Sequence, residues 1–212
     1  MMMMIMMGGV QILIKGLSIA SGYYKDPQKT KDAWDDDGWF STGDVGRFDK
    51  EGRLWVVDRK KSMFKLAQGE YVSPEHLESV LLKSPWVRQV WVYGKPSERY
   101  VVAVVVPEKK VVMEWGKRNG LDWDFLALCD LKNLKNEILT SLRSEVEAKK
   151  LPSFQKPVDV HLEASLDDLQ QGFTLDKGML TPTMKFKRAK MVEIYKDVIE
   201  EMYRHSHEGE KR

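Results

Sequence analysis

Two side chains in the first third of the sequence have the chemistry to bind a sugar hydroxyl or a phosphate. Asp44 ends the turn STGD at 41–44, and its two carboxylate oxygens can accept hydrogen bonds from a vicinal diol such as a ribose. Arg59 follows fifteen residues later and offers a fixed fork of donors to ribose or phosphate. Each signal is weak alone, because TGD is more often only a turn and the run RKK at 59–61 is more often a solvated surface. The two residues together indicate a binding site for a ribose or a phosphate.

A third candidate is Lys185, in the segment LTPTMKFKR at 180–188. A lysine ammonium on a flexible stem can neutralise anions that must be held close together. The alternative is a surface lysine that precedes a basic helix. We interpret the neighbouring basic residues in that second way, as solvated side chains of the helix: Lys187, Arg188 and Lys190.

Composition excludes several classes of protein. The 212 residues are 42% apolar and 31% charged, which is ordinary for a soluble globular protein. The net charge of +2 gives no strong field towards nucleic acid, so no nucleic-acid partner is expected. The single cysteine, Cys129, excludes an internal disulfide framework and fits a reducing compartment. The four histidines form no cluster, and the sequence predicts no metal site.

The opening MMMMIMM has no basic start, long apolar run or cleavage site of the kind that a secretory signal carries. We expect residues 1–8 to be a disordered or artefactual start. No apolar run approaches the roughly 20 residues that a membrane-spanning helix needs. The sequence therefore predicts neither a signal segment nor a transmembrane segment in this chain.

The chain up to residue 60 is expected to be rich in short strands. The pattern predicts strands at 10–15, 45–48 and 53–57, with the turn DKEG joining the last two. A short helix is expected over 28–34, with Asp26 as its cap and Pro27 at its first position.

After Asp58 the composition shifts to the basic run RKKSMFK, where we place a domain boundary. Ser73 and Pro74 are typical of the start of a helix. Two nearly continuous apolar strands follow, at 87–94 and 100–108, and their composition indicates burial on both faces. Further elements are expected in this order: helices at 109–119 and 131–150, a strand at 158–164 and a helix at 188–205. These elements make an α+β domain of the commonest size, roughly 150 residues.

Four motifs carry a resemblance to a known family. GWFSTGD, VVDRKK, KLAQGEYVSPEHLE and LTPTMKFKR occur in this order. Together they resemble the C-terminal part of the adenylate-forming, or AMP-binding, enzymes. QGEYV and LTPTMK, with the basic pair that follows, are most similar to eukaryotic-type long-chain fatty acyl-CoA synthetases. The resemblance runs from about Gly9 to the last helix.

The resemblance implies a fold and its division. Residues 9–60 would be the end of the large AMP-binding domain, a β-rich remnant of it. Residues 61–212 would be the mobile, α+β C-terminal domain, which turns about a hinge at Lys61.

The resemblance also implies a role for each motif residue. Asp44 and Arg59 would hold the ribose of ATP and of the acyl-adenylate, and Lys185 would act in catalysis at the α-phosphate and the acyl carboxylate. Gly69 would lie beside the path of CoA, with Lys65 as a weaker CoA contact. QGEYV is one residue longer than the corresponding loop of luciferase-like relatives, which puts Lys65 and Gln68 in doubt as CoA contacts.

The sequence contains no Ser/Thr/Gly-rich phosphate loop of the TSGTTG type and no Walker-type glycine loop. We therefore expect a fragment of a long-chain fatty acid–CoA ligase that is inactive without its N-terminal domain. The implied cofactors are ATP, CoA and Mg²⁺, with the metal site in the missing part. Two alternatives stay open: a stand-alone non-catalytic C-terminal module, or a synthetase for a medium-chain or aryl acid.

The partners that the resemblance implies are small molecules, namely a fatty acid, ATP and CoA. Peripheral membrane contact of a full-length protein is a further expectation, because the product is amphipathic. The expected location is the cytoplasm or the cytosolic face of the endoplasmic reticulum or peroxisomal membrane.

Overall fold

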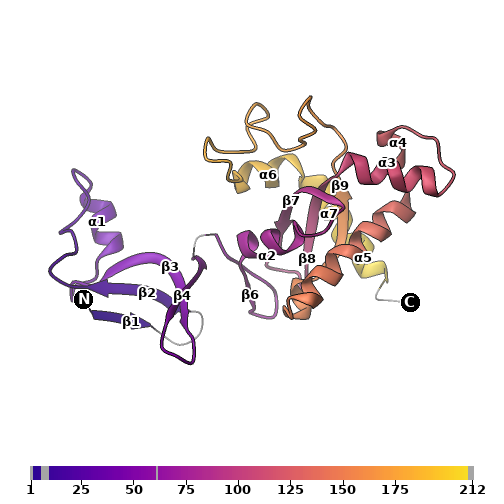
Figure 1. Cartoon of the computed structure of the whole chain (residues 1–212). Coiled ribbons are helices and arrows are strands. Elements are labelled where there is room, and N and C mark those ends of the chain that lie inside the picture. The colour runs from indigo at the N-terminus through magenta and orange to yellow at the C-terminus, as the bar shows by residue number, and fades with distance from the viewer. Residues whose placement is uncertain (1, 6–9, 61, 210–212) are drawn as a thin grey trace. The chain divides into compact units, whose positions relative to one another are not determined.

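The computed structural model describes residues 2–5, 10–60 and 62–209 (Figure 1). The chain divides into two compact units, Met1–Phe64 and Lys65–Arg212. The sequence placed the boundary at residue 61, within a few residues of this division. Each unit is described below by itself.

The first unit is a four-stranded antiparallel sheet in the order β1-β2-β3-β4. A short helix, α1, precedes β3, and the Asp26 carboxylate accepts a hydrogen bond from the Lys29 backbone N–H at 2.9 Å. The predicted cap and the N1 proline of this helix are thus confirmed. The elements are β1 (Met2–Ile5), β2 (Val10–Lys15), α1 (Pro27–Ala33), β3 (Phe40–Phe48) and β4 (Leu54–Arg59).

Two expectations for this unit differ from the structure. Residues 1–8 were expected to be disordered or artefactual, but Met2–Ile5 form β1 and pair with β2. STGD was expected to be a tight turn at a strand end, but it lies inside β3. Gly43 adopts φ 76° there, and the pairing register of β3 shifts after Val45. Because Gly43 can adopt this left-handed conformation, β3 is irregular at this point but continues to Phe48.

The second unit is an α+β domain, as predicted. Its main sheet has the order β7-β8-β9, with β8 antiparallel to β7 and parallel to β9. A two-stranded sheet, β5 (Phe64–Lys65) with β6 (Tyr71–Val72), comes before it in the chain. The remaining elements are α2 (Pro74–Leu81), β7 (Val87–Tyr93), β8 (Val101–Pro107), α3 (Lys109–Arg118), α4 (Phe125–Cys129), α5 (Lys132–Ala148), a 3₁₀ turn (Ser153–Gln155), β9 (Pro157–Leu162), α6 (Arg188–Ile194) and α7 (Lys196–Gly209).

The core of this unit is built on β8, whose seven residues are all buried. Val102, Val104 and Val106 belong to one hydrophobic cluster with buried side chains of α6 and α7. The alternate residues of a strand face the other side of the sheet, so β8 is covered on both faces. The prediction of two buried faces is confirmed for β8. It holds for the second half of β7 as well, where the consecutive residues Val90, Trp91 and Val92 are buried, whereas Arg88 near the start of this strand is exposed.

The helix expected over 188–205 is two helices. Tyr195 separates α6 from α7, with φ −99° and ψ 17°, and its hydroxyl donates a hydrogen bond to Glu163 Oε2 at 2.6 Å. Burial raises the pKa of this phenol well above its ordinary value, so Tyr195 keeps its proton and remains a donor. The two helices share an apolar face, because Met191, Tyr195 and Met202 are buried.

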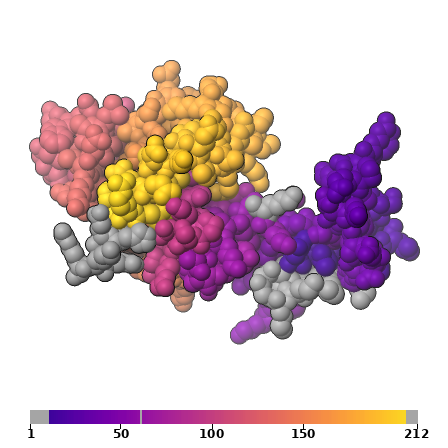
Figure 2. Space-filling model, turned by 180° about the vertical axis from the view of Figure 1, so that it is seen from behind, coloured from indigo at the N-terminus to yellow at the C-terminus, as the bar shows by residue number. Residues whose placement is uncertain are grey.

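The C-terminal helix packs against the sheet over a wide surface. In Figure 2 its yellow side chains lie against the magenta segment between β7 and β8. Tyr203 Oη donates to the Tyr100 carbonyl at 3.1 Å, and Lys95 Nζ lies 2.7 Å from Glu200 Oε1. Among the residues that the structure describes, no helix is long and apolar enough to cross a bilayer.

Candidate functional site

Asp44 and Arg59 face each other on neighbouring strands. They are register partners in the β3–β4 ladder, and Arg59 Nε lies 3.0 Å from Asp44 Oδ1. The Arg59 side chain is 72% exposed and that of Asp44 is 27% exposed. The structure therefore brings together two residues that the sequence predicted to share a ribose.

The backbone around Asp44 is held by bonds to both neighbouring strands. Thr42 Oγ1 donates to the Ile12 carbonyl at 2.9 Å and accepts from the Asp44 backbone N–H at 3.0 Å. The Lys60 backbone N–H donates to the Gly43 carbonyl at 2.8 Å. Thr42 is thus a supporting residue that sequence reasoning missed. Its position between Ser41 and Gly43 was read only as turn chemistry.

The predicted hinge residue, Lys61, lies outside the described residues. The predicted CoA residues, Lys65 and Gly69, lie at the two-stranded sheet of β5 and β6. Gly69 has φ 91°, a left-handed conformation that favours glycine. Lys65 is exposed, and its ammonium lies 5.7 Å from the centre of the Tyr71 ring.

The loop between β5 and β6 is anchored to the turn between β7 and β8. The Ala67 backbone N–H donates to the Glu98 carbonyl, and the Gln68 side-chain amide donates to the Arg99 carbonyl, both at 2.9 Å. Gln68 therefore helps to hold the loop in place.

Lys185 lies on a small hairpin that ends just before α6. Leu180 and Phe186 form an isolated antiparallel bridge, and the Thr181 N–H donates to the Lys185 carbonyl at 2.8 Å. Met184 adopts φ 61° at the tip. The Lys185 side chain is 67% exposed, and its ammonium lies 3.6 Å from Glu75 Oε2 on α2.

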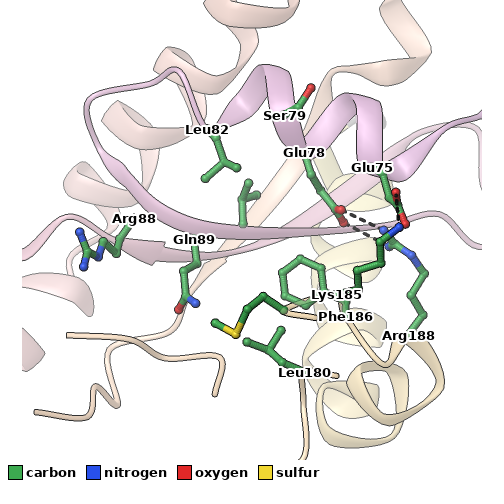
Figure 3. Close-up of a pocket in the computed structure, with 12 residues that line it drawn as sticks. Glu75, Glu78, Ser79, Leu82, Arg88, Gln89, Leu180, Lys185, Phe186 and Arg188 are labelled. Atoms are coloured by element: carbon green, nitrogen blue, oxygen red, sulfur yellow. Dashed lines mark hydrogen bonds and ion pairs between the residues drawn. The ribbon is translucent and has the colours of Figure 1, made fainter. Parts of the chain in front are cut away.

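A pocket of about 310 Å³ lies beside this hairpin (Figure 3). Its apolar wall includes Leu82 and Val90, which belong to the α2–β7 region, and Leu180 and Phe186, which belong to the hairpin. Glu75 and Lys185 lie together at one side of the pocket, and Arg88 lies at the other (Figure 3). The Lys185 ammonium is therefore available to an anion, and the exposed carboxylate of Glu75 is the one ion-pair partner that it has among the described residues.

An ion pair with a buried carboxylate lies next to the end of the hairpin, where α6 begins. Arg188 Nη2 lies 2.9 Å from Glu78 Oε2, and Nη1 donates to Oε1 at 3.1 Å. The Val92 backbone N–H also donates to Glu78 Oε1, at 2.9 Å. Burial raises the pKa of Glu78, although Arg188 and the Val92 N–H both act to lower it. The interpretation of Arg188 as a solvated basic residue is therefore wrong.

Within the part of the chain that the structure describes, the remaining reactive side chains do not form a second site. Cys129 is buried, and desolvation raises the pKa of its thiol to about 12, so it is a poor nucleophile. Across residues 2–5, 10–60 and 62–209, no group of three or more His, Cys, Asp or Glu side chains could hold a metal ion.

Comparison with known proteins is consistent with this architecture. Residues 76–168 match the family described as the AMP-binding enzyme C-terminal domain. Human Long-chain-fatty-acid--CoA ligase 6 is 38% identical over 196 residues, which are 92% of this chain and 27% of the relative. Fatty acyl-CoA synthetase A of Dictyostelium discoideum is 40% identical over 91% of this chain and 28% of its own length.

Solved structures agree with the sequence relatives. The A domain of carboxylic acid reductase from Segniliparus rugosus, in complex with AMP and a co-purified carboxylic acid, has a TM-score of 0.73. It is 32% identical, over 92% of this chain and 28% of that protein. O-succinylbenzoate Coenzyme A Synthetase from Bacillus subtilis shares the fold, with a TM-score of 0.54 at 20% identity.

Residues 76–168 match the AMP-binding enzyme C-terminal domain, and the fold is that of the C-terminal part of adenylate-forming enzymes. The homologues of this chain are long-chain fatty acid–CoA ligases, and the match covers only the C-terminal part of those enzymes. The chain spans about a quarter of their length. The family and fold class that the sequence predicted are confirmed.

Proposed function

We propose that this chain is the C-terminal part of a long-chain fatty acid–CoA ligase. Such an enzyme converts a fatty acid, ATP and CoA to acyl-CoA, AMP and diphosphate through an acyl-adenylate. The observation that carries the proposal is the identity of 37–38% to human long-chain fatty acid–CoA ligases over 92% of this chain. The carboxylic acid reductase domain, which was solved with AMP and a carboxylic acid, supports carboxylate activation as the shared chemistry.

The first unit has the donors and acceptors that a nucleotide ribose requires. The Asp44 carboxylate can accept from the two ribose hydroxyls, and Arg59 can donate to the ribose or the phosphate. The two groups already lie within 3.0 Å of each other, and both side chains are accessible to solvent. We propose that they hold the ribose of ATP and of the acyl-adenylate.

We propose Lys185 as the catalytic residue of adenylation. This step brings a fatty acid carboxylate towards the α-phosphate, so two anions must approach each other. Two opposite unit charges about 4 Å apart attract each other by about 4 kcal/mol at an effective dielectric of 20. This is about a thousandfold in rate if the interaction is made only in the transition state. Glu75 neutralises Lys185 only weakly at 3.6 Å, because both side chains are well exposed.

The proposed cofactors are ATP, CoA and Mg²⁺. The chemistry of the described residues fits the organic cofactors: Lys185 and Arg59 are exposed cations, and the loop with Lys65 and Gly69 is accessible for CoA. Mg²⁺ would require carboxylates that the described part of the chain does not group together. The metal site is accordingly proposed to lie in the part of the longer relatives that has no counterpart here.

A pair of proteins tests the proposal. The first is the 212-residue chain alone, and the second is a chimera that joins it to the N-terminal part of human Long-chain-fatty-acid--CoA ligase 6. With palmitate, ATP, Mg²⁺ and CoA, we expect acyl-CoA synthesis by the chimera and none by the chain alone. A folded chimera that is inactive on long-chain, medium-chain and aryl acids would favour a non-catalytic module. Turnover by the chain alone would contradict the expected dependence on the N-terminal domain.

Within the chimera, Asp44→Ala is expected to raise the KM for ATP by about ten- to a hundredfold, because the carboxylate makes charged hydrogen bonds to the ribose. The KM for the fatty acid should change little. Asp36→Ala removes an exposed carboxylate from the same unit and serves as the matched control. Equal ATP kinetics for the Asp44 and Asp36 variants would rule out the ribose role.

A further inference from the structure

The Lys185 hairpin needs an external support. Lys185 is exposed, and its ammonium has a long contact of 3.6 Å with Glu75. The turn within the hairpin depends on a left-handed Met184, which is a strained conformation for a residue with a side chain. The hairpin by itself therefore does not fix where the ammonium lies.

The support lies three residues further along the chain. Arg188 begins α6, and its side chain is only 26% exposed. Both of its terminal nitrogens contact Glu78, and Nη1 also lies 3.4 Å from the Val92 carbonyl. Figure 3 shows this guanidinium beside the Glu78 carboxylate, below α2. One side chain thus joins the end of the hairpin to both α2 and β7.

Helix α2 presents two carboxylates to this segment. Glu75 and Glu78 are three residues apart, so they lie on the same face of the helix. Glu78 takes Arg188 in a buried pair, while Glu75 takes Lys185 in an exposed one. The two contacts lie one after the other on the same face of α2. Of the two, the Arg188–Glu78 contact has the planar geometry with two bonds that fixes the position of a side chain.

We propose that Arg188 and Glu78 are positioning residues for Lys185. The buried pair fixes the start of α6 on α2 and β7, and the short connection from Lys185 to Arg188 carries that position to the ammonium. The importance of this for the reaction rests on the proposed role of Lys185 in adenylation. The position itself is a property of the chain alone and can be measured without any reaction.

The substitution that tests the pair is Glu78→Gln with Arg188→Met. It removes both charges together, so no buried charge is left without a partner, and the glutamine oxygen can still accept from the Val92 N–H. Lys190→Met is the matched control, because it removes a cation from α6 whose partner, Glu193, is an exposed surface residue.

Amide hydrogen exchange on the 212-residue chain is the first measurement. We expect the Thr181 and Lys187 amides, which donate to the Lys185 and Met179 carbonyls, to exchange at least about tenfold faster in the double variant. The β8 amides should keep their protection, and Lys190→Met should change neither group. Unchanged exchange at Thr181 and Lys187 would overturn the proposal. Equal acceleration in β8 would show general destabilisation instead, and would also overturn it.

The chimera provides the functional measurement. In the double variant, kcat for adenylation should fall about tenfold while the KM for ATP changes little, since the ammonium is misplaced in the transition state. Arg188→Lys retains the positive charge but not the planar guanidinium with its two bonds to Glu78. We expect its adenylation rate to lie between those of the double variant and the unsubstituted chimera. Faster amide exchange at Thr181 and Lys187 with an unchanged rate of adenylation would refute the positioning role. An inactive parent chimera would count against the proposed function and leave the exchange result to decide the positioning.

Discussion

Replacement of Lys185 by alanine is expected to reduce acyl-adenylate formation by about a thousandfold in the chimera, from the loss of one charge at the reacting anions. Thioester formation from a supplied acyl-adenylate and CoA should be largely spared. The acyl carboxylate has already lost its negative charge in the acyl-adenylate, so the approach of two anions that Lys185 favours in the first step does not occur in the second. Because the Lys185 side chain is exposed, its removal should not destabilise the fold, so a folding defect would not explain the lost activity.

The two half-reactions must be measured separately to see this difference. Pyrophosphate exchange reports adenylation, and release of AMP from a supplied acyl-adenylate and CoA reports the second step. Lys187→Ala is the matched control, because Lys187 is an exposed lysine two residues away in the same segment. Equal slowing of both half-reactions by Lys185→Ala would contradict the proposed role. So would an equal effect of the two lysine substitutions.

The second large effect concerns stability and its dependence on pH. Arg188→Met alone leaves the Glu78 carboxylate buried without its cation, and such a change costs about 3–5 kcal/mol of unfolding free energy. The Glu78 side chain is only 7% exposed, so water cannot replace the lost partner. We expect this loss near pH 7.5, where the carboxylate of the unfolded chain is fully ionised.

The sign of the pH dependence follows from the raised pKa of Glu78. The folded state holds the Glu78 proton more tightly than the unfolded state, so the contribution of this group is most favourable below the ordinary glutamate pKa. That contribution declines as the pH rises through the raised folded pKa. Loss of Arg188 raises this pKa further, because the guanidinium lowers it in the native protein. The destabilisation by Arg188→Met should therefore be small near pH 4.5 and should grow towards neutrality.

Urea unfolding of the chain at pH 4.5 and pH 7.5 measures this effect. The double variant with Glu78→Gln has no carboxylate to titrate at this position, so its loss of stability should not grow between pH 4.5 and pH 7.5. Glu75 also raises the pKa of Glu78, and Glu75→Gln alone should lower it slightly. A destabilisation by Arg188→Met that does not depend on pH would show that Glu78 is not ionised in the native pair.

Elements that depend on neighbours in the sequence could be predicted from the sequence. The Ser73 hydroxyl accepts from the His76 N–H, and Asp26 caps α1, because a cap and its partner are only three residues apart. The buried residues of α5, Leu134, Ile138, Leu142 and Val146, recur at every fourth position, a helical pattern that is visible in the sequence. The continuous apolar composition of 100–108 likewise predicted a strand with two buried faces, and all seven residues of β8 are buried.

The motif residues could be identified from the sequence, but their surroundings could not. The sequence predicted that Asp44 and Arg59 bind the same ribose. In the structure their side chains also contact each other directly, across β3 and β4. STGD resembled a tight turn because its residues are small and polar, yet pairing with β2 and β4 keeps it in a strand. Lys185 was found by its motif, whereas the hairpin that presents it depends on the pairing of Leu180 with Phe186.

Features made by contacts between distant parts of the chain required the tertiary structure. Arg188 has the same sequence context as the exposed Lys187, but it is partly buried because it pairs with Glu78, 110 positions away. The break between α6 and α7 occurs at Tyr195, which donates a hydrogen bond to Glu163. Local patterns such as caps and stripes arise within a few residues, so the sequence alone determined them. A buried charge or a helix break depends on desolvation and on a partner that only folding brings within reach.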